Sequence, residues 1–155
     1  MNIIRTFSAF LIIIGFSINT HAQCAGFHRT ARCFMHEPKE FKTYSQSKSA
    51  VVQINDVYTY QTVLFGNKDY IFNLCTEKGY KALHFKITNS KTNELIYDNI
   101  DDKYNQSIGF TVKDDITVNV EATILSEKET KIDPNKKRVC LGIQILWRLI
   151  PKIGF

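Results

Sequence analysis

Two cysteines and two histidines alternate within one short stretch of the chain, in the order Cys24-x3-His28-x4-Cys33-x2-His36. Thiolates and imidazoles are the ligands of structural zinc sites, but such sites usually space them as Cys-x2–4-Cys and His-x3–5-His. The spacing here departs from that pattern, and export would favour oxidation of the thiols. We therefore favour disulfides over a zinc site at these residues.

Export is predicted by residues 1–22, which have the layout of a removable signal peptide. Arg5 supplies the positive start, residues 10–16 form a short apolar run, and Ala22 stands at the end before Gln23. The run is shorter than the roughly 20 residues that a membrane-spanning helix needs. We expect cleavage, a mature chain without a transmembrane helix, and a location in the periplasm, on the cell surface or outside the cell. Lipid attachment at Cys24 is disfavoured, because the preceding Gln23 is large and polar.

All four cysteines lie beyond the signal, and an even count in an oxidising compartment predicts two disulfides. They are Cys24, Cys33, Cys75 and Cys140. Spacing favours a local Cys24–Cys33 bond and leaves Cys75 for Cys140, while the connectivity itself stays open. Strand alternation places Cys75 and Cys140 on faces opposite the core, so they would meet on neighbouring strands beneath the N-terminal segment.

The acidic stretch 98–102 is the candidate cation site. Asp98, Asp101 and Asp102 offer carboxylates beside the amide of Asn99. Calcium takes six to eight oxygen ligands, and extracellular modules bind it weakly. The order of an EF-hand is missing, so we expect a solvated loop. We expect no cofactor, with calcium held by these three aspartates as the alternative.

No catalytic motif is found, and we predict that the protein is not an enzyme. The sequence lacks a Gly-x-Ser-x-Gly turn, a His-Glu-x-x-His helix and a phosphate-binding glycine loop. His84 is expected to point outward from a strand without a local partner. The net charge of +5 is spread along the chain except at Lys136–Arg138, which argues against a nucleic-acid partner. A site assembled from distant loops is the alternative.

Tyrosine rings are a further candidate feature, because exposed rings stack on sugars or peptides. Tyr58 and Tyr60 share a strand face with Leu64, which favours packing in the core. The candidates are Tyr58, Tyr60, Tyr80, Tyr97 and Tyr104.

The elements that position these residues are short strands. From Ser49 onward the hydrophobic period is two, and turn residues separate the segments. The expected strands are 50–54, 57–65, 70–75, 82–88, 95–97, 108–112, 116–124 and 140–149. About eight strands and no long helix predict an all-β fold, an antiparallel β-sandwich or jelly roll. We expect an irregular N-terminal segment at 23–48 and a β-sandwich domain at 49–155. The expected core is Leu83, Phe85, Ile87, Phe110, Val118, Val120, Ile143, Ile145 and Trp147.

Several short stretches carry a resemblance to a known group of proteins. They are Gln46–Ala50, Lys68–Tyr70, Leu83–Ile87, Leu95–Asn99 and Val139–Ile143. Together they resemble small secreted β-sandwich proteins of unassigned function that are common in Bacteroidota. The resemblance implies a bacterial, exported, non-catalytic module, and it brings no catalytic residues to transfer.

The pattern therefore predicts a secreted or periplasmic binding or structural module whose partner is a protein or a cell-surface glycan. One alternative is an eight-stranded outer-membrane β-barrel, because the sequence ends on the aromatic Phe155, although Pro151 interrupts the last strand. A second alternative is a calcium-dependent adhesion or carbohydrate-binding domain. The binding residues, the ligand and the oligomeric state do not follow from the sequence.

Overall fold

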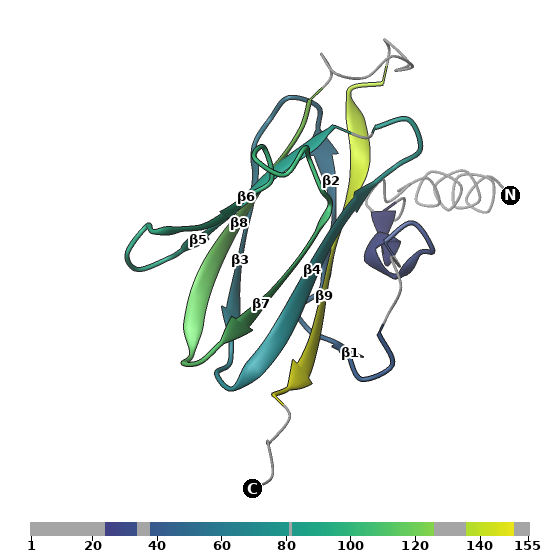
Figure 1. The fold of residues 1–155 in the computed structure, drawn as a ribbon. Coiled ribbons are helices and arrows are strands. Elements are labelled where there is room, and N and C mark those ends of the chain that lie inside the picture. The colour runs from purple at the N-terminus through teal and green to yellow at the C-terminus, as the bar shows by residue number, and fades with distance from the viewer. Residues whose placement is uncertain (1–23, 34–37, 81, 126–135, 151–155) are drawn as a thin grey trace, which may run out of the picture.

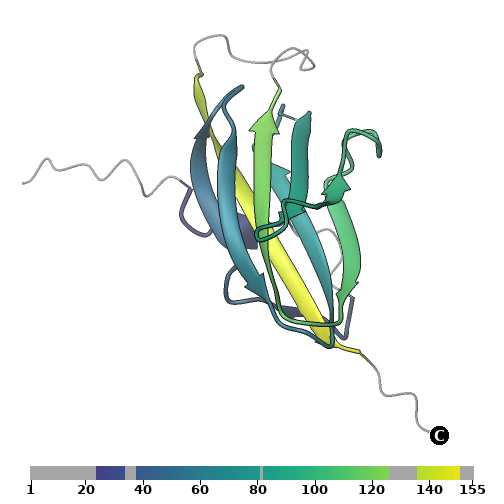
Figure 2. The same cartoon turned by 90° about the vertical axis from the view of Figure 1, so that its left-hand side faces the viewer.

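Two antiparallel sheets face each other in the structure, a computed structural model that describes residues 24–33, 38–80, 82–125 and 136–150. Sheet A has the order β1-β9-β4-β7, with β2 also beside β9, and sheet B has the order β3-β8-β5-β6. Figures 1 and 2 show the two layers. The predicted antiparallel β-sandwich is confirmed. The β-barrel alternative is wrong, because the described strands form two separate sheets and not one closed sheet.

The strands are short and agree closely with the hydrophobic pattern. Sheet A contains β1 (Lys42–Thr43), β2 (Lys48–Gln53), β4 (Lys68–Thr76), β7 (Ser107–Val112) and β9 (Arg138–Leu149). Sheet B contains β3 (Tyr58–Leu64), β5 (Leu83–Asn89), β6 (Leu95–Asp98) and β8 (Ile116–Ile124). The described strands number nine and not about eight, because β1 and the start of β2 lie in the stretch predicted to be irregular.

The core lies between the sheets, and strand alternation fills it. In β8, Val118, Val120, Ala122 and Ile124 are buried, while the residues between them are half exposed. Of the expected core, Phe110 and Trp147 are only partly buried and pack against its edge. The other expected residues are fully buried: Leu83, Phe85, Ile87, Val118, Val120, Ile143 and Ile145. Burial of each such side chain stabilises the fold by roughly 1.5–3 kcal/mol.

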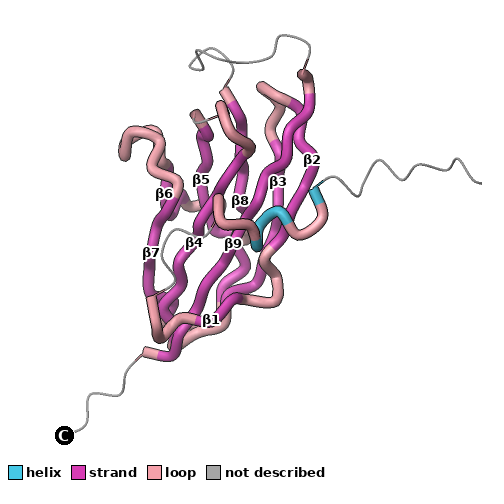
Figure 3. The backbone as a smooth tube through the Cα atoms, turned by 90° about the vertical axis from the view of Figure 1, so that its right-hand side faces the viewer, coloured by secondary structure: helices cyan, strands magenta, loops and turns pink. Residues whose placement is uncertain are grey.

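Strand β9 departs from the alternation, because it is covered on both faces. Every residue from Val139 to Leu146 is buried. One face packs in the core, and the N-terminal segment covers the other. Figure 3 shows this segment, with its 3-10 helix Phe27–Arg29, crossing the outer face of sheet A, the face turned away from sheet B.

Strand β1 follows from its partner and not from its own sequence. Its two residues pair with the end of β9, Lys42 with Trp147 and Thr43 with Leu146. Two residues are too few to show a hydrophobic period, so their extended conformation is determined by pairing with β9.

Three predictions fall on residues outside the described ranges. These are the signal peptide at 1–22, the ligand candidate His36 and the terminal Phe155. Within the described ranges, no helix has the length and apolar character needed to cross a bilayer.

Candidate functional site

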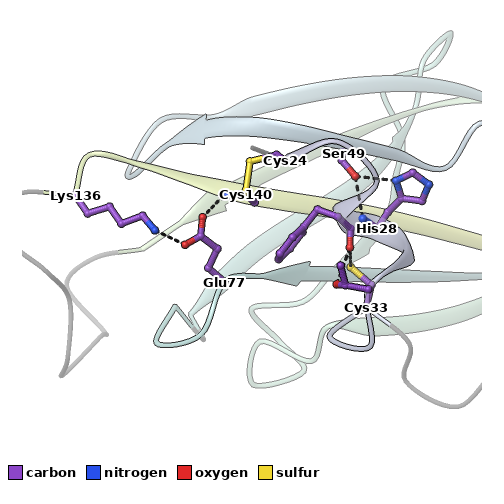
Figure 4. The surroundings of a disulfide bond; sticks show 9 residues. Cys24, His28, Cys33, Ser49, Glu77, Lys136 and Cys140 are labelled. Carbon is purple, nitrogen blue, oxygen red and sulfur yellow. Dashed lines mark hydrogen bonds and ion pairs between the residues drawn. A yellow bond between two sulfur atoms is a disulfide. The ribbon is translucent and has the colours of Figure 1, made fainter. Parts of the chain in front are cut away.

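Residues 24–33 form a loop that is covalently fixed at both ends, which we call the stapled loop. Cys24 is bonded to Cys140 in β9, with Cα atoms 5.3 Å apart, and Cys33 is bonded to Cys75 in β4, with Cα atoms 5.1 Å apart. Because β4 and β9 are neighbours, the two disulfides hold the loop against adjacent strands of one sheet. Figure 4 shows the bond between Cys24 and Cys140.

The four cysteines therefore form two disulfides, but the favoured pairing of Cys24 with Cys33 and Cys75 with Cys140 is wrong. Strands β4 and β9 are neighbours as expected, yet Cys75 lies directly opposite Gly142. Cys140 is displaced by two residues, and diagonal neighbours of this kind lie about 7–8 Å apart. A disulfide needs Cβ atoms about 3.5–4.5 Å apart. Each strand cysteine therefore bonds to the segment above it, and oxidation removes both thiolates of the zinc candidate.

Gly142 provides the space for this arrangement. A Cβ atom at this position would lie 2.5 Å from the Cys33 Sγ, 2.6 Å from the Cys75 Sγ and 3.0 Å from the Cα of His28. The missing side chain thus lets the disulfide and the loop backbone approach the strand closely.

The interior of the stapled loop is wound by short-range hydrogen bonds. Gly26 adopts a left-handed conformation with φ 72°, and its carbonyl accepts the N–H of Arg29 at 2.8 Å. The N–H of Thr30 reaches the carbonyl of Phe27, and that of Cys33 reaches Thr30, both at 3.0 Å. The two disulfides and these hydrogen bonds leave the loop few accessible conformations.

His28 attaches the middle of the loop to β2 through Ser49. The backbone N–H of His28 donates to the Ser49 Oγ at 2.8 Å, and Nδ1 lies 2.7 Å from the same oxygen. The Arg29 Nε donates to Nε2 of His28 at 3.3 Å, so we assign the ring proton to Nδ1. Burial, and then the positive charge of Arg29, hold the pKa of His28 below its ordinary value. Ser49 thus accepts two hydrogen bonds from a neutral histidine, which fastens the loop to the sheet.

The loop presents two positive charges and no negative one. Arg29 and Arg32 are its only charged residues, both are exposed, and neither forms an ion pair with another described residue. The nearby Glu77 is already engaged, because it pairs with Lys136 and accepts the backbone N–H of Cys140 at 2.9 Å (Figure 4). The guanidinium groups are therefore available to an anionic partner.

The predicted calcium ligands do not converge. Asp98 contacts His84 at 3.0 Å and Asp102 accepts from the Tyr97 hydroxyl at 3.1 Å, while Asp101 is exposed. Nowhere in the described part of the chain do three or more His, Cys, Asp or Glu side chains gather as metal ligands would. The expectation that His84 lacks a partner is wrong, because β6 brings Asp98 beside it.

Asn99, in the same stretch, has a structural role. Its side chain is fully buried, accepts the Phe85 N–H at 2.8 Å, and donates to the carbonyls of Leu83 at 2.8 Å and Asn105 at 3.0 Å. The amide therefore continues the hydrogen bonding of β5 where β6 has ended.

The candidate tyrosines mostly serve the core. Tyr58, Tyr60 and Tyr97 pack against it while partly exposed, and Tyr80 is buried within it. Burial, and then Asp102, raise the pKa of Tyr97 to about 12. Tyr104 is half exposed in the loop after β6.

Arg29, Arg32 and Gln144 were not predicted as site residues from the sequence. Gln144 is 1% exposed although it is polar, because it lies on the outer face of β9 together with Cys140 and Gly142. The strand alternation that placed the cysteines on that face also placed Gln144 there, so its position could have been predicted from the sequence. Nothing in the sequence pattern indicated the two arginines, because their exposed position on the loop depends on the disulfide pairing.

Comparisons with known proteins give no family. No family model matches the chain, and no curated protein matches it. Among solved structures, the chain is similar to PliG of Aeromonas hydrophila, a periplasmic inhibitor of g-type lysozyme, with 8% identity and a TM-score of 0.47. The match covers 73% of this chain and 92% of that one. At this identity and TM-score, the likeness carries no inference about what this chain binds.

Proposed function

We propose that the protein is an exported, non-catalytic module that binds a partner protein through the stapled loop. The observation that carries this proposal is the attachment of residues 24–33 to β9 and β4 by two disulfides. A loop held in one conformation loses little entropy on binding, so its exposed side chains contribute more of their contact energy to affinity.

Export is supported by the same bonds, because disulfides persist in oxidising compartments and are rare in reducing ones. A protein partner is favoured over a glycan by the chemistry of the loop, which exposes two arginines. Arginine is enriched at the energetically dominant positions of protein interfaces. The resemblance to secreted β-sandwich proteins of Bacteroidota agrees with this proposal and remains a prediction.

Site-specific cross-linking tests the location of the interface. A photoreactive amino acid replaces Ala31, an exposed loop residue, or Lys91, which is exposed between β5 and β6. We expect a cross-linked protein from the native cell envelope with the first variant and not with the second. Cross-linking from Lys91 alone would contradict the proposed interface. A cross-linked glycan in place of a protein would show that the partner is a glycan.

Affinity measurements with that partner then test the two arginines. We expect Arg29→Ala/Arg32→Ala to weaken binding at least about tenfold. The matched control Lys91→Ala/Lys113→Ala removes the same charge from exposed residues elsewhere and should change the affinity less than about twofold. Equal losses in both variants would show that net charge, and not the loop, determines binding.

A further inference from the structure

A groove of about 530 Å³ separates the stapled loop from the turn that follows β1, on the outer face of sheet A. We call it the loop–turn groove. Its size is within the range of about 300–1,000 Å³ that is typical of ligand sites. No carboxylate is among the described residues that line it. These are His28, Arg29, Thr43, Tyr44, Ser45, Ser47 and Gln144.

Gln144 supplies a fixed hydrogen-bond donor at the base of the groove. Its Oε1 accepts the Asn73 Nδ2 at 3.0 Å, and the Asn73 Oδ1 accepts the Ser107 hydroxyl at 2.6 Å. This chain orients the amide so that Nε2 points away from Asn73. Among the described residues, no acceptor takes the Nε2 hydrogens, and no fully buried side-chain nitrogen or oxygen lacks a partner. The Nε2 atom therefore keeps a small exposed area beside the groove that its residue lines, although Gln144 as a whole is only 1% exposed.

Arg29 and Ser45 supply further donors at the rim. Nε of Arg29 is directed to His28, which leaves both terminal nitrogens of the guanidinium group for a ligand. Ser45 is exposed, and its hydroxyl has no hydrogen-bond partner in the described part of the chain. The hydroxyl of Ser47 is excluded, because it bridges the backbone N–H and carbonyl of Ile145 at 2.9 and 3.1 Å.

We propose that the loop–turn groove binds a carboxylate carried by an acidic peptide segment of the partner. The inference rests on the proposed function and assigns a ligand group to one part of the interface. The guanidinium fork of Arg29 matches a carboxylate in shape and charge. The Nε2 of Gln144 and the Ser45 hydroxyl add neutral donors, and none of the described side chains that line the groove is negatively charged. A peptide is favoured over a free anion because the groove adjoins the exposed loop, so one partner chain would contact both.

Nuclear magnetic resonance tests the proposal on the purified wild-type protein. The probes are a triglutamate peptide with blocked ends, the matching triglutamine peptide, and inorganic phosphate. We expect triglutamate to shift the side-chain amide signals of Gln144 and the Nε signal of Arg29, with at least about tenfold tighter binding than triglutamine. If phosphate shifts these signals as strongly as triglutamate does, the peptide assignment is wrong and the ligand is a free oxyanion. If no probe shifts them, the groove is not an anion site.

Substitution tests the role of Gln144 directly. Gln144→Glu keeps an acceptor for Asn73 and replaces the donor by a negative charge, so triglutamate binding should fall at least about tenfold. The control is Gln53→Glu, which makes the same change at an exposed residue at the far end of β2. Ser45→Ala, a mild change at an exposed position, should weaken binding about two- to fivefold. Unchanged triglutamate binding in Gln144→Glu would contradict the groove proposal and leave the loop interface standing, because cross-linking at Ala31 tests that interface separately.

Discussion

The contact between Gly142 and the disulfide above it makes a sharp prediction for a single methyl group. In Gly142→Ala, the new Cβ would lie 2.5 and 2.6 Å from two sulfur atoms that are covalently bonded to each other and not free to rotate away. Gly109→Ala, in β7 of the same sheet, is the matched control, because its Cβ would meet only ordinary contacts at 3.6 and 3.7 Å.

The expected change in the free energy of unfolding follows from one stabilising and two destabilising effects. Replacing glycine by alanine in a compatible conformation stabilises by about 0.4–1 kcal/mol through the unfolded chain, which is the full expectation for Gly109→Ala. At Gly142 the overlap adds an overpacking cost of about 1–3 kcal/mol. The upper limit is loss of the Cys33–Cys75 bond, about 4 kcal/mol in the chain-entropy model for a sequence separation of 42. The gain through the unfolded chain is the same in both variants and cancels, so we expect Gly142→Ala to be about 1–4 kcal/mol less stable than Gly109→Ala.

Urea unfolding of both variants measures this difference, and thiol titration together with peptide mass mapping reports whether the disulfide survives. A variant that loses the bond will show two reactive thiols at positions 33 and 75. Equal stability of the two variants, with no reactive thiol in either, would refute the close approach of the loop to β9.

Three further predictions concern the disulfides, the buried amide and pH. Cys24→Ala/Cys140→Ala should lower the free energy of unfolding by about 4–5 kcal/mol for a sequence separation of 116, measured in urea, and a loss below about 1 kcal/mol would contradict this pairing. Asn99→Ala leaves two buried backbone groups, the N–H of Phe85 and the carbonyl of Leu83, without partners and should cost at least about 2 kcal/mol, which thermal and urea unfolding would both detect. Burial lowers the pKa of His28 in the folded chain from its ordinary value of 6.5, so the unfolded chain binds the proton more readily. The contribution of neutral His28 to stability is therefore complete above pH 6.5 and is lost as the pH falls below that value. His28→Gln should therefore lose less stability than wild type between pH 7.5 and pH 5, and parallel curves for the two proteins would refute the assignment.

The layered fold was predictable from alternation alone. Ile116–Ile124 is bounded in the structure at the residues that the pattern indicates, because one face of β8 packs in the core and the other faces outward. The same rule placed Cys75 and Cys140 on the outer face of their strands. Strand alternation is a local property, so the sequence carries it in full.

The site was not predictable to the same degree, because it depends on register. Which cysteine meets which is decided by the alignment that puts Cys75 opposite Gly142, and this alignment is set by contacts along the whole of β4 and β9. The partner of His84 depends likewise on the pairing of β6 with β5. Asn99 looked like a loop residue open to a cation, and only the course of the chain after β6 shows that its amide completes a strand.

The bond between Cys24 and Cys140 turns most of the chain into a covalent ring. A single cut by a protease anywhere between these residues leaves both fragments joined. Tension applied between a point before Cys24 and a point after Cys140 passes through the sulfur bridge and not through residues 25–139. Residues 25–139 are thereby shielded from tension carried along the backbone for as long as this bond stays oxidised.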